Sequence, residues 1–144
     1  MEIYTIGFTK SSAERFFGRL RKAGIRRLID IRLNNVSQLA GFAKRDDLAF
    51  LLRELCGAEY RHELRLAPEQ PLLDHYRKTH DWPTYTEAFL ALLQARKVEE
   101  QLERALFTVP SVLLCSEASA EHCHRRLAAE YLRDCWGGIN IVHL

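Results

Sequence analysis

The residues best suited to chemistry lie in two neighbouring segments late in the chain. Cys115 and Glu117 follow an apolar stretch, and Cys123, His124 and Arg125 come shortly afterwards. A thiol, a carboxylate, an imidazole and a guanidinium are the groups of nucleophilic and acid–base catalysis. One interpretation is that Cys115 or Cys123 is a thiolate nucleophile with His124 as its base. Arg125 is then expected to bind anionic oxygens of the substrate, and Glu117 to transfer protons.

Two other interpretations of this cluster remain open. Free cysteine is often a small buried side chain, in which case His124 would donate a hydrogen bond to a loop carbonyl. The cluster could also bind a polar ligand without covalent chemistry. Metal binding is disfavoured, because the spacing matches no standard zinc pattern and residues 122–124 would point in different directions on one helix. We therefore expect no metal and no cofactor.

A second pair of charged residues, Asp30 and Arg32, ends an apolar segment. An unpaired buried carboxylate is costly, so Asp30 must be paired or must face a ligand. Alternation along a strand places both residues on one face. We expect either a structural ion pair between them or a functional pair in which Asp30 handles protons and Arg32 binds the substrate.

The third candidate is the turn that contains Gly7, Thr9 and Lys10. A strand, a glycine turn and a helix with a serine cap at Ser11 can bind an anion on backbone amides. The turn lacks the repeated glycines of a Walker or dinucleotide loop. A simple connection between strand and helix is the alternative interpretation.

Strands that alternate with helices would position these residues. Strands are predicted over residues 3–6, 27–32, 58–62, 111–115 and 139–143, and helices over 11–23, 46–56, 98–106 and 119–133, with another that starts near Pro83. Residues 33–44 are expected to form a polar loop, and residues 64–82 a long irregular connection with one helical turn. The pattern predicts one α/β domain over residues 1–144, with a mostly parallel sheet flanked by helices on both faces. Ligands of such sheets bind beyond the carboxyl ends of the strands.

Composition excludes several classes of protein. The chain of 144 residues has 47% hydrophobic residues, a net charge of +2 and no apolar run long enough to cross a bilayer. We expect a cytoplasmic protein without a membrane partner, in which all four cysteines are free thiols. Basic residues gather in the first helix and just after it, and this face could track a phosphate backbone. Tyr60, Tyr76, Trp82 and Tyr85 could stack on a base or sugar, although packing of a loop on the core is the more common role.

The motifs resemble those of the DUF488 family, a domain of unknown function. The resemblance rests on Tyr4-Thr5-Ile6-Gly7, Asp30-Ile31-Arg32, Gly41-Phe42 and Leu113-Leu114-Cys115-Ser116-Glu117, followed by Cys123-His124-Arg125. It implies an α/β domain and a polar site that gathers Asp30, Arg32, Cys115, Glu117, Cys123, His124 and Arg125. Phe8-Thr9 stands where family members usually have His-Ser, and Leu33 stands near the place of a usual proline. The resemblance implies no established reaction.

Together these observations favour an enzyme, a hydrolase or a transferase, that acts on a phosphate-bearing substrate such as a nucleotide or nucleic acid. A nucleic-acid-binding module without catalytic activity and a partner-binding subunit are the alternatives. The sequence gives no indication of the oligomeric state.

Overall fold

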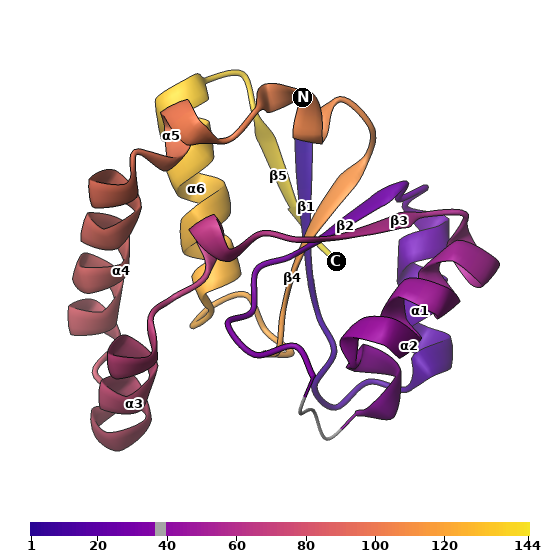
Figure 1. Ribbon diagram of the computed structural model, residues 1–144, viewed down its shortest axis with the longest axis horizontal. Coiled ribbons are helices and arrows are strands. Elements are labelled where there is room, and N and C mark those ends of the chain that lie inside the picture. Colours follow the sequence, from indigo (N-terminus) through magenta and orange to yellow (C-terminus); the bar gives the residue numbers. More distant parts are fainter. Residues whose placement is uncertain (37–39) are drawn as a thin grey trace.

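The computed structural model describes residues 1–36 and 40–144, and Figure 1 shows a central sheet between two groups of helices. The strands are β1 (Glu2–Gly7), β2 (Arg27–Asp30), β3 (Glu59–His62), β4 (Ser111–Cys115) and β5 (Asn140–His143). Their order is β3-β2-β4-β1-β5, and all neighbours run parallel. The predicted α/β fold with a parallel sheet is confirmed.

The helices lie on both faces of this sheet (Figure 1). They are α1 (Ala13–Lys22), α2 (Arg45–Leu51), α3 (Gln70–Thr79), α4 (Trp82–Arg96), α5 (Val98–Gln101) and α6 (His124–Trp136), with short helical turns η1 (Gly41–Ala43), η2 (Leu52–Cys56), η3 (Leu64–Leu66) and η4 (Arg104–Phe107). Among the described residues, no helix combines the length and the apolar character needed to cross a membrane.

Two apolar clusters hold the helices to the sheet. On one face, Phe16 and Leu20 of α1 and Leu48 of α2 pack against β2 and β4. On the other face, Phe89 of α4 and Leu132 of α6 belong to the second cluster. All five residues of β4 are buried, as expected for a central strand covered on both sides.

The carboxyl ends of three strands meet at one edge of the sheet. Gly7 of β1 is the register partner of Cys115 of β4, and Asp30 of β2 pairs with Leu114. The segments that follow these strands therefore emerge side by side. This edge is where ligands of parallel α/β sheets bind.

The connection predicted as irregular over residues 64–82 is instead largely helical. It contains the ten-residue helix α3, which has Pro71 in its first turn and ends at His80 in a left-handed conformation with φ of 53°. Proline is tolerated in a first helical turn because its missing N–H has no intrahelical partner there. Leu72, Leu73 and Tyr76 follow at helical spacing and pack against the core.

Helix α6 begins at His124 and not near Ser119 as predicted. Backbone carbonyls of the preceding segment are used elsewhere: those of Glu117 and Ala118 accept hydrogen bonds from Arg125, and that of Ser116 accepts one from Thr9. These long-range bonds replace the bonds of an additional helical turn.

Three smaller predictions also need correction. The N-cap of α1 is Ser12 rather than Ser11, and its Oγ accepts a hydrogen bond from the Arg15 amide at 3.2 Å. The helix predicted over 98–106 ends at Gln101, where the buried Leu102 turns the backbone into an extended conformation. Strand β2 ends at Asp30 rather than at residue 32. The loop predicted over 33–44 includes residues 37–39, which lie outside the described residues.

Candidate functional site

A cavity of about 720 Å³ lies beyond the carboxyl ends of β2 and β4. We call it the site cavity. Of the predicted site residues, Arg32, Cys115, Glu117, Cys123 and His124 line it. Its volume falls in the range of about 300–1,000 Å³ that is typical of small-molecule sites. The structure thus brings together five residues that are up to 92 positions apart in the chain, from 32 to 124.

Arg32 is held in the lining of this cavity by Asp30. The Arg32 Nε and Nη2 atoms donate to the two carboxylate oxygens of Asp30 at 2.8 and 2.7 Å, and the Arg32 amide donates to the same carboxylate at 3.1 Å. Asp30 is 0% exposed and Arg32 3%. The ion pair expected between these residues is therefore present. Asp30 does not line the site cavity, so it is placed to orient Arg32 rather than to meet a ligand.

Further polar side chains fix this ion pair from the neighbouring strand. The Tyr60 hydroxyl of β3 donates to Asp30, and it accepts a hydrogen bond from Asn35 Nδ2 at 2.9 Å. Burial, followed by the hydrogen bond to Asp30, raises the pKa of Tyr60, which keeps its proton available. His62 Nε2 donates to the Arg32 carbonyl at 2.7 Å. The sequence interpretation missed Asn35 and His62 as supports of this ion pair. His62 is the register partner of Asp30, and Asn35 lies in the loop that follows β2.

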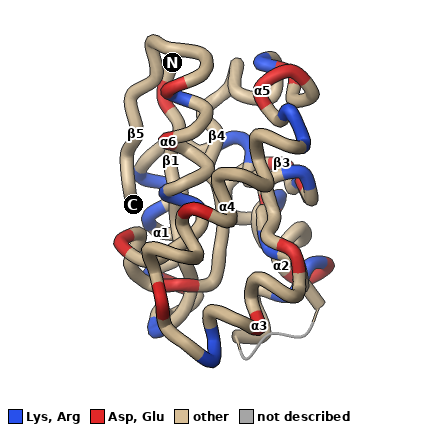
Figure 2. The backbone as a smooth tube through the Cα atoms, turned by 90° about the vertical axis from the view of Figure 1, so that its left-hand side faces the viewer, with Lys and Arg blue, Asp and Glu red and all other residues tan. Residues whose placement is uncertain are grey.

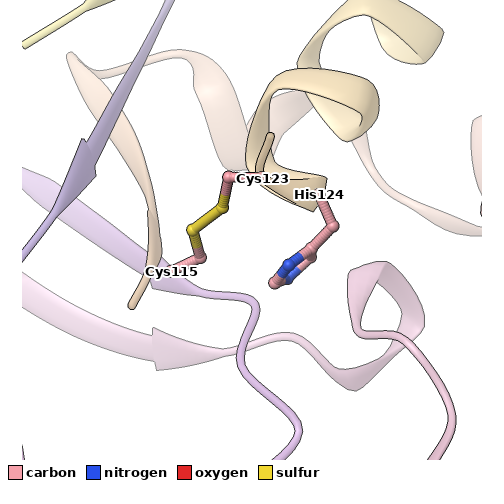
Figure 3. Close-up of side chains that lie close together, drawn as sticks. All are labelled: Cys115, Cys123 and His124. Atoms are coloured by element: carbon pink, nitrogen blue, oxygen red, sulfur yellow. A yellow bond between two sulfur atoms is a disulfide. The ribbon is translucent and has the colours of Figure 1, made fainter. Parts of the chain in front are cut away.

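Cys115 and Cys123 are joined by a disulfide, with Cα atoms 7.4 Å apart. The expectation of four free thiols is therefore wrong for this pair and holds for Cys56 and Cys135. Cys115 ends β4, and Cys123 is the residue that precedes α6, with an extended backbone that turns its side chain toward β4 (Figure 3). In the disulfide form neither sulfur is a nucleophilic thiolate.

His124 lies beside this sulfur pair at the start of α6 (Figure 3). Its Nε2 donates to the Ile31 carbonyl at 2.8 Å, which is the loop-carbonyl bond of the structural interpretation. Burial lowers the pKa of His124 to about 4, and the bond to Ile31 opposes that shift only in part. The ring is therefore neutral at physiological pH, and its Nδ1 is left as an acceptor or ligand atom.

Arg125 does not line the site cavity and is 1% exposed. Its guanidinium donates to Thr5 Oγ1 at 3.3 Å, to Cys115 Sγ at 3.4 Å and to the carbonyls of Glu117 and Ala118. Burial, together with the nearby charge of Arg19, lowers the pKa of Arg125 to about 10, so it keeps its charge at neutral pH. In this position Arg125 fixes the loop before α6 against β1.

The Gly7 turn is filled by the same loop. A Cβ atom on Gly7 would lie 1.5 Å from the Glu117 carbonyl oxygen, and the Thr9 amide donates to the Ser116 carbonyl at 3.0 Å. Gly7, Thr9 and Lys10 do not line the site cavity. The glycine is therefore needed for a close approach of two backbone segments.

One part of the lining of the site cavity, which we call the aromatic wall, comes from α3 and α4. The Trp82 and Tyr85 rings of α4 stack at 5.3 Å, and Tyr76 of α3 packs against both. The His122 ring lies 5.1 Å from Trp82. Arg77 and His80, both exposed, also belong to the lining. The lining of the site cavity therefore combines the cation of Arg32, the aromatic wall and further nitrogen-bearing side chains.

A protein-family model described as domain of unknown function DUF488 matches residues 12–132 of the 144-residue chain. The match includes the Asp30, Cys115 and Cys123 motifs but begins after Gly7. No curated protein and no solved structure matches the chain significantly.

Proposed function

The chain belongs to the DUF488 family, and we propose that it is an enzyme that acts on a phosphate-bearing substrate of the nucleotide class, bound in the site cavity. The proposal rests on one observation above all. Arg32 Nη1 is buried and has no hydrogen-bond partner among the described residues, while the other two guanidinium nitrogens are bound to Asp30.

The geometry of the guanidinium explains why this atom is suited to a phosphate. Nε and Nη2 form one edge of the plane, which Asp30 occupies, and Nη1 lies on the edge that faces away from the carboxylate. The guanidinium carbon of Arg32 lies over the Phe8 ring, 5.2 Å from the ring centroid, and this contact helps to hold the guanidinium plane in place. Buried polar atoms are normally paired, and phosphate oxygens are preferred partners of arginine.

The aromatic wall supports a substrate that also carries a flat ring. Trp82 belongs to the same cavity lining as Arg32, and base stacking on an aromatic side chain is worth about 1–3 kcal/mol. Arg77 in the same lining adds a second positive charge. A nucleotide carries both features, an anion and a planar base, in one molecule.

Proton transfer is assigned to Glu117, which is exposed at the edge of the site cavity. Its backbone carbonyl is held by Arg125, so the position of the residue is fixed while its carboxylate can reach a bound substrate. Asp30 is unsuited to this role because its oxygens are occupied by Arg32 and Tyr60. The sequence interpretation gave these two carboxylates equal weight.

The rival proposal, nucleic-acid binding on the basic first helix, has weaker support. Arg19 donates to the carbonyls of Gly7 and Leu144, and Arg27 is paired with Glu59. Figure 2 shows acidic and basic residues interspersed along the chain. Two basic side chains of this region are thus held by contacts within the fold.

Ligand binding can be measured through the fluorescence of Trp82. In a Trp136→Phe background, which leaves Trp82 as the single tryptophan, the protein is titrated with AMP, with adenosine and with inorganic phosphate. A hydrogen bond to a charged group is worth about 1.5–3 kcal/mol, so AMP should bind about 10-fold more tightly than adenosine or better. Arg77→Gln should weaken AMP binding without affecting adenosine.

The matched control is Arg53→Gln. Arg53 is exposed, pairs with Glu54 and does not line the site cavity, so its variant should bind AMP as the parent does. Equal affinity for AMP and adenosine, or no saturable quenching, would contradict the proposed site. Oligonucleotide binding that weakens steeply with salt and does not respond to Arg77→Gln would favour the rival.

Catalysis requires a separate assay. A panel of nucleotides is incubated with the protein and the products are separated by chromatography. Glu117→Gln should lower the turnover rate about 100-fold or more, with AMP binding unchanged. If the wild-type protein binds nucleotides and converts none of them, the binding role survives and the enzymatic one fails.

A further inference from the structure

Cys115, Cys123 and His124 place three metal-ligand atoms within 4.8 Å of one another. The spacing of these residues matches no standard zinc pattern, and the second argument against a metal was that residues 122–124 were assigned to one helix. The structure removes that objection: α6 begins at His124, and Cys123 has extended backbone angles, φ −136° and ψ 140°. Its side chain therefore turns toward Cys115 instead of following the helical wheel.

We propose that the reduced Cys115–Cys123 pair and His124 form a Zn²⁺ site with three protein ligands that faces the site cavity. Two thiolates and one imidazole make a ligand set known from catalytic zinc sites, which keep a fourth position for water or substrate. All three residues line the site cavity, so that fourth position is open to it. The inference does not depend on the nucleotide being the substrate.

The orientation of His124 fits a zinc ligand. Its Nε2 donates to the Ile31 carbonyl at 2.8 Å, which leaves the Nδ1 lone pair for the ion. Histidine ligands almost always donate their second ring N–H to a carbonyl or carboxylate, because this bond fixes the tautomer and the ring. The structural hydrogen bond and the metal-binding role are therefore compatible in one side chain.

The buried charge of Arg125 gives a second, independent reason to expect a thiolate at Cys115. Arg125 is 1% exposed, and no carboxylate among the described residues lies within ion-pair distance of it. All its acceptors are uncharged in the disulfide form, and one of them is Cys115 Sγ, 3.4 Å from Nη1. A buried charge without a counter-ion is unfavourable. A thiolate at Cys115 provides that counter-ion, and the bond to Arg125 becomes charge-assisted.

The backbone leaves room for the ion. The Cα atoms of Cys115 and Cys123 are 7.4 Å apart, beyond the range of about 4.4–6.8 Å that is usual for a directly bonded pair. Two sulfurs bound to one zinc at about 2.3 Å each lie roughly 3.8 Å apart. The sulfurs can therefore separate around the ion without bringing the two segments closer.

The disulfide and the zinc site are alternative states of one pair. Reduction by a dithiol delivers two electrons and two protons to the sulfurs, breaks the S–S bond and leaves the reductant as its own disulfide. Zn²⁺ then binds as the two thiol protons are released. Oxidation of the pair removes both thiolate ligands and should release the ion.

The test uses a Cys56→Ser, Cys135→Ser double variant, which removes the two free cysteines and keeps the proposed ligands. After reduction and chelator treatment, titration with Co²⁺ should give one bound ion with thiolate-to-cobalt charge-transfer absorbance, and Zn²⁺ should displace it. Adding Cys115→Ser or Cys123→Ser should weaken binding more than about 100-fold, since even changes outside the ligand set cost about 10–100-fold.

His124→Gln provides a third variant, in which the amide can keep the hydrogen bond to Ile31 while the ring nitrogen is lost. It should also weaken Co²⁺ binding. The proposal is overturned if the double variant shows two reactive thiols and binds no stoichiometric Co²⁺. It is equally overturned if Cys115→Ser binds Co²⁺ as the parent does, or if the disulfide resists reduction in the folded protein. None of these measurements depends on nucleotide binding, so the zinc proposal can fail while the nucleotide proposal stands, and the reverse.

Discussion

Replacing Gly7 with alanine tests whether the loop before α6 must lie against the end of β1. A Cβ atom at Gly7 would lie 1.5 Å from the Glu117 carbonyl oxygen and 2.4 Å from Arg125 Nη1. Both neighbours are constrained, because this carbonyl accepts a hydrogen bond from the buried Arg125. The backbone of the loop must therefore move, since no flexible side-chain tip can make way.

The expected cost follows from these contacts. Forcing an extra methyl group into a packed interior costs about 1–3 kcal/mol, and loss of the charged hydrogen bond to Glu117 adds about 1.5–3 kcal/mol. We expect Gly7→Ala to lower the free energy of unfolding by about 3–5 kcal/mol. Because the moving loop lines the site cavity, ligand binding should weaken as well.

Gly18→Ala is the matched control. Gly18 lies within α1, and a Cβ atom added there meets no atom within 4 Å. Alanine is the better helix former by about 0.5–1 kcal/mol, so this variant should be more stable than the wild type. Urea unfolding followed by circular dichroism measures both changes. A loss below about 1 kcal/mol for Gly7→Ala, the size of an ordinary substitution, would refute the close approach.

Two further variants test the supports of the site cavity. Asp30→Asn leaves the buried Arg32 without its counter-ion and should lower the free energy of unfolding in urea by about 3–5 kcal/mol. Adding Arg32→Met should restore at least about 1 kcal/mol of this loss. Strictly additive losses from the two changes would contradict the pairing. Asp81 caps α4 through Thr84, whose hydroxyl and amide lower the pKa of Asp81, so Asp81→Ala should reduce the thermal midpoint by about 2–4 °C at neutral pH. A carboxylate with a lowered pKa stabilises the fold only in its ionised form. The difference in thermal midpoint between the wild type and Asp81→Ala should therefore vanish as the pH falls through the pKa of Asp81 in the folded protein. A difference that persists in strong acid would show that the carboxylate is not the cap.

The fold could be predicted because local patterns and tertiary packing agree at the strands. β4 is an uninterrupted apolar segment, and all its residues are buried. The helical segment predicted over 46–56 stops at Gly57, which has a left-handed conformation with φ of 60°. The start of α6 could not be predicted, because the carbonyls before it are used by Thr9 and Arg125, and these bonds depend on β1 lying next to β4. These long-range hydrogen bonds cannot be predicted from the local sequence.

The location of the candidate site could be predicted from the sequence better than the roles of its residues. Strand ends in a parallel sheet meet at one edge, which is why Arg32, Cys115 and His124 lie in one cavity. The distinction between Asp30 and Glu117 required coordinates, because burial and hydrogen-bond partners decide it. The same is true of Arg125, which the motif alone assigned to a substrate. The catalytic and binding roles of these residues remain predictions until the assays above are made.

A crystal structure of the protein soaked with AMP tests the central claim most directly, because the proposed contacts have defined positions. The account predicts a phosphate oxygen within hydrogen-bond distance of Arg32 Nη1 and the base stacked on Trp82. Density for AMP on the basic surface of α1, with the site cavity unchanged, would contradict it.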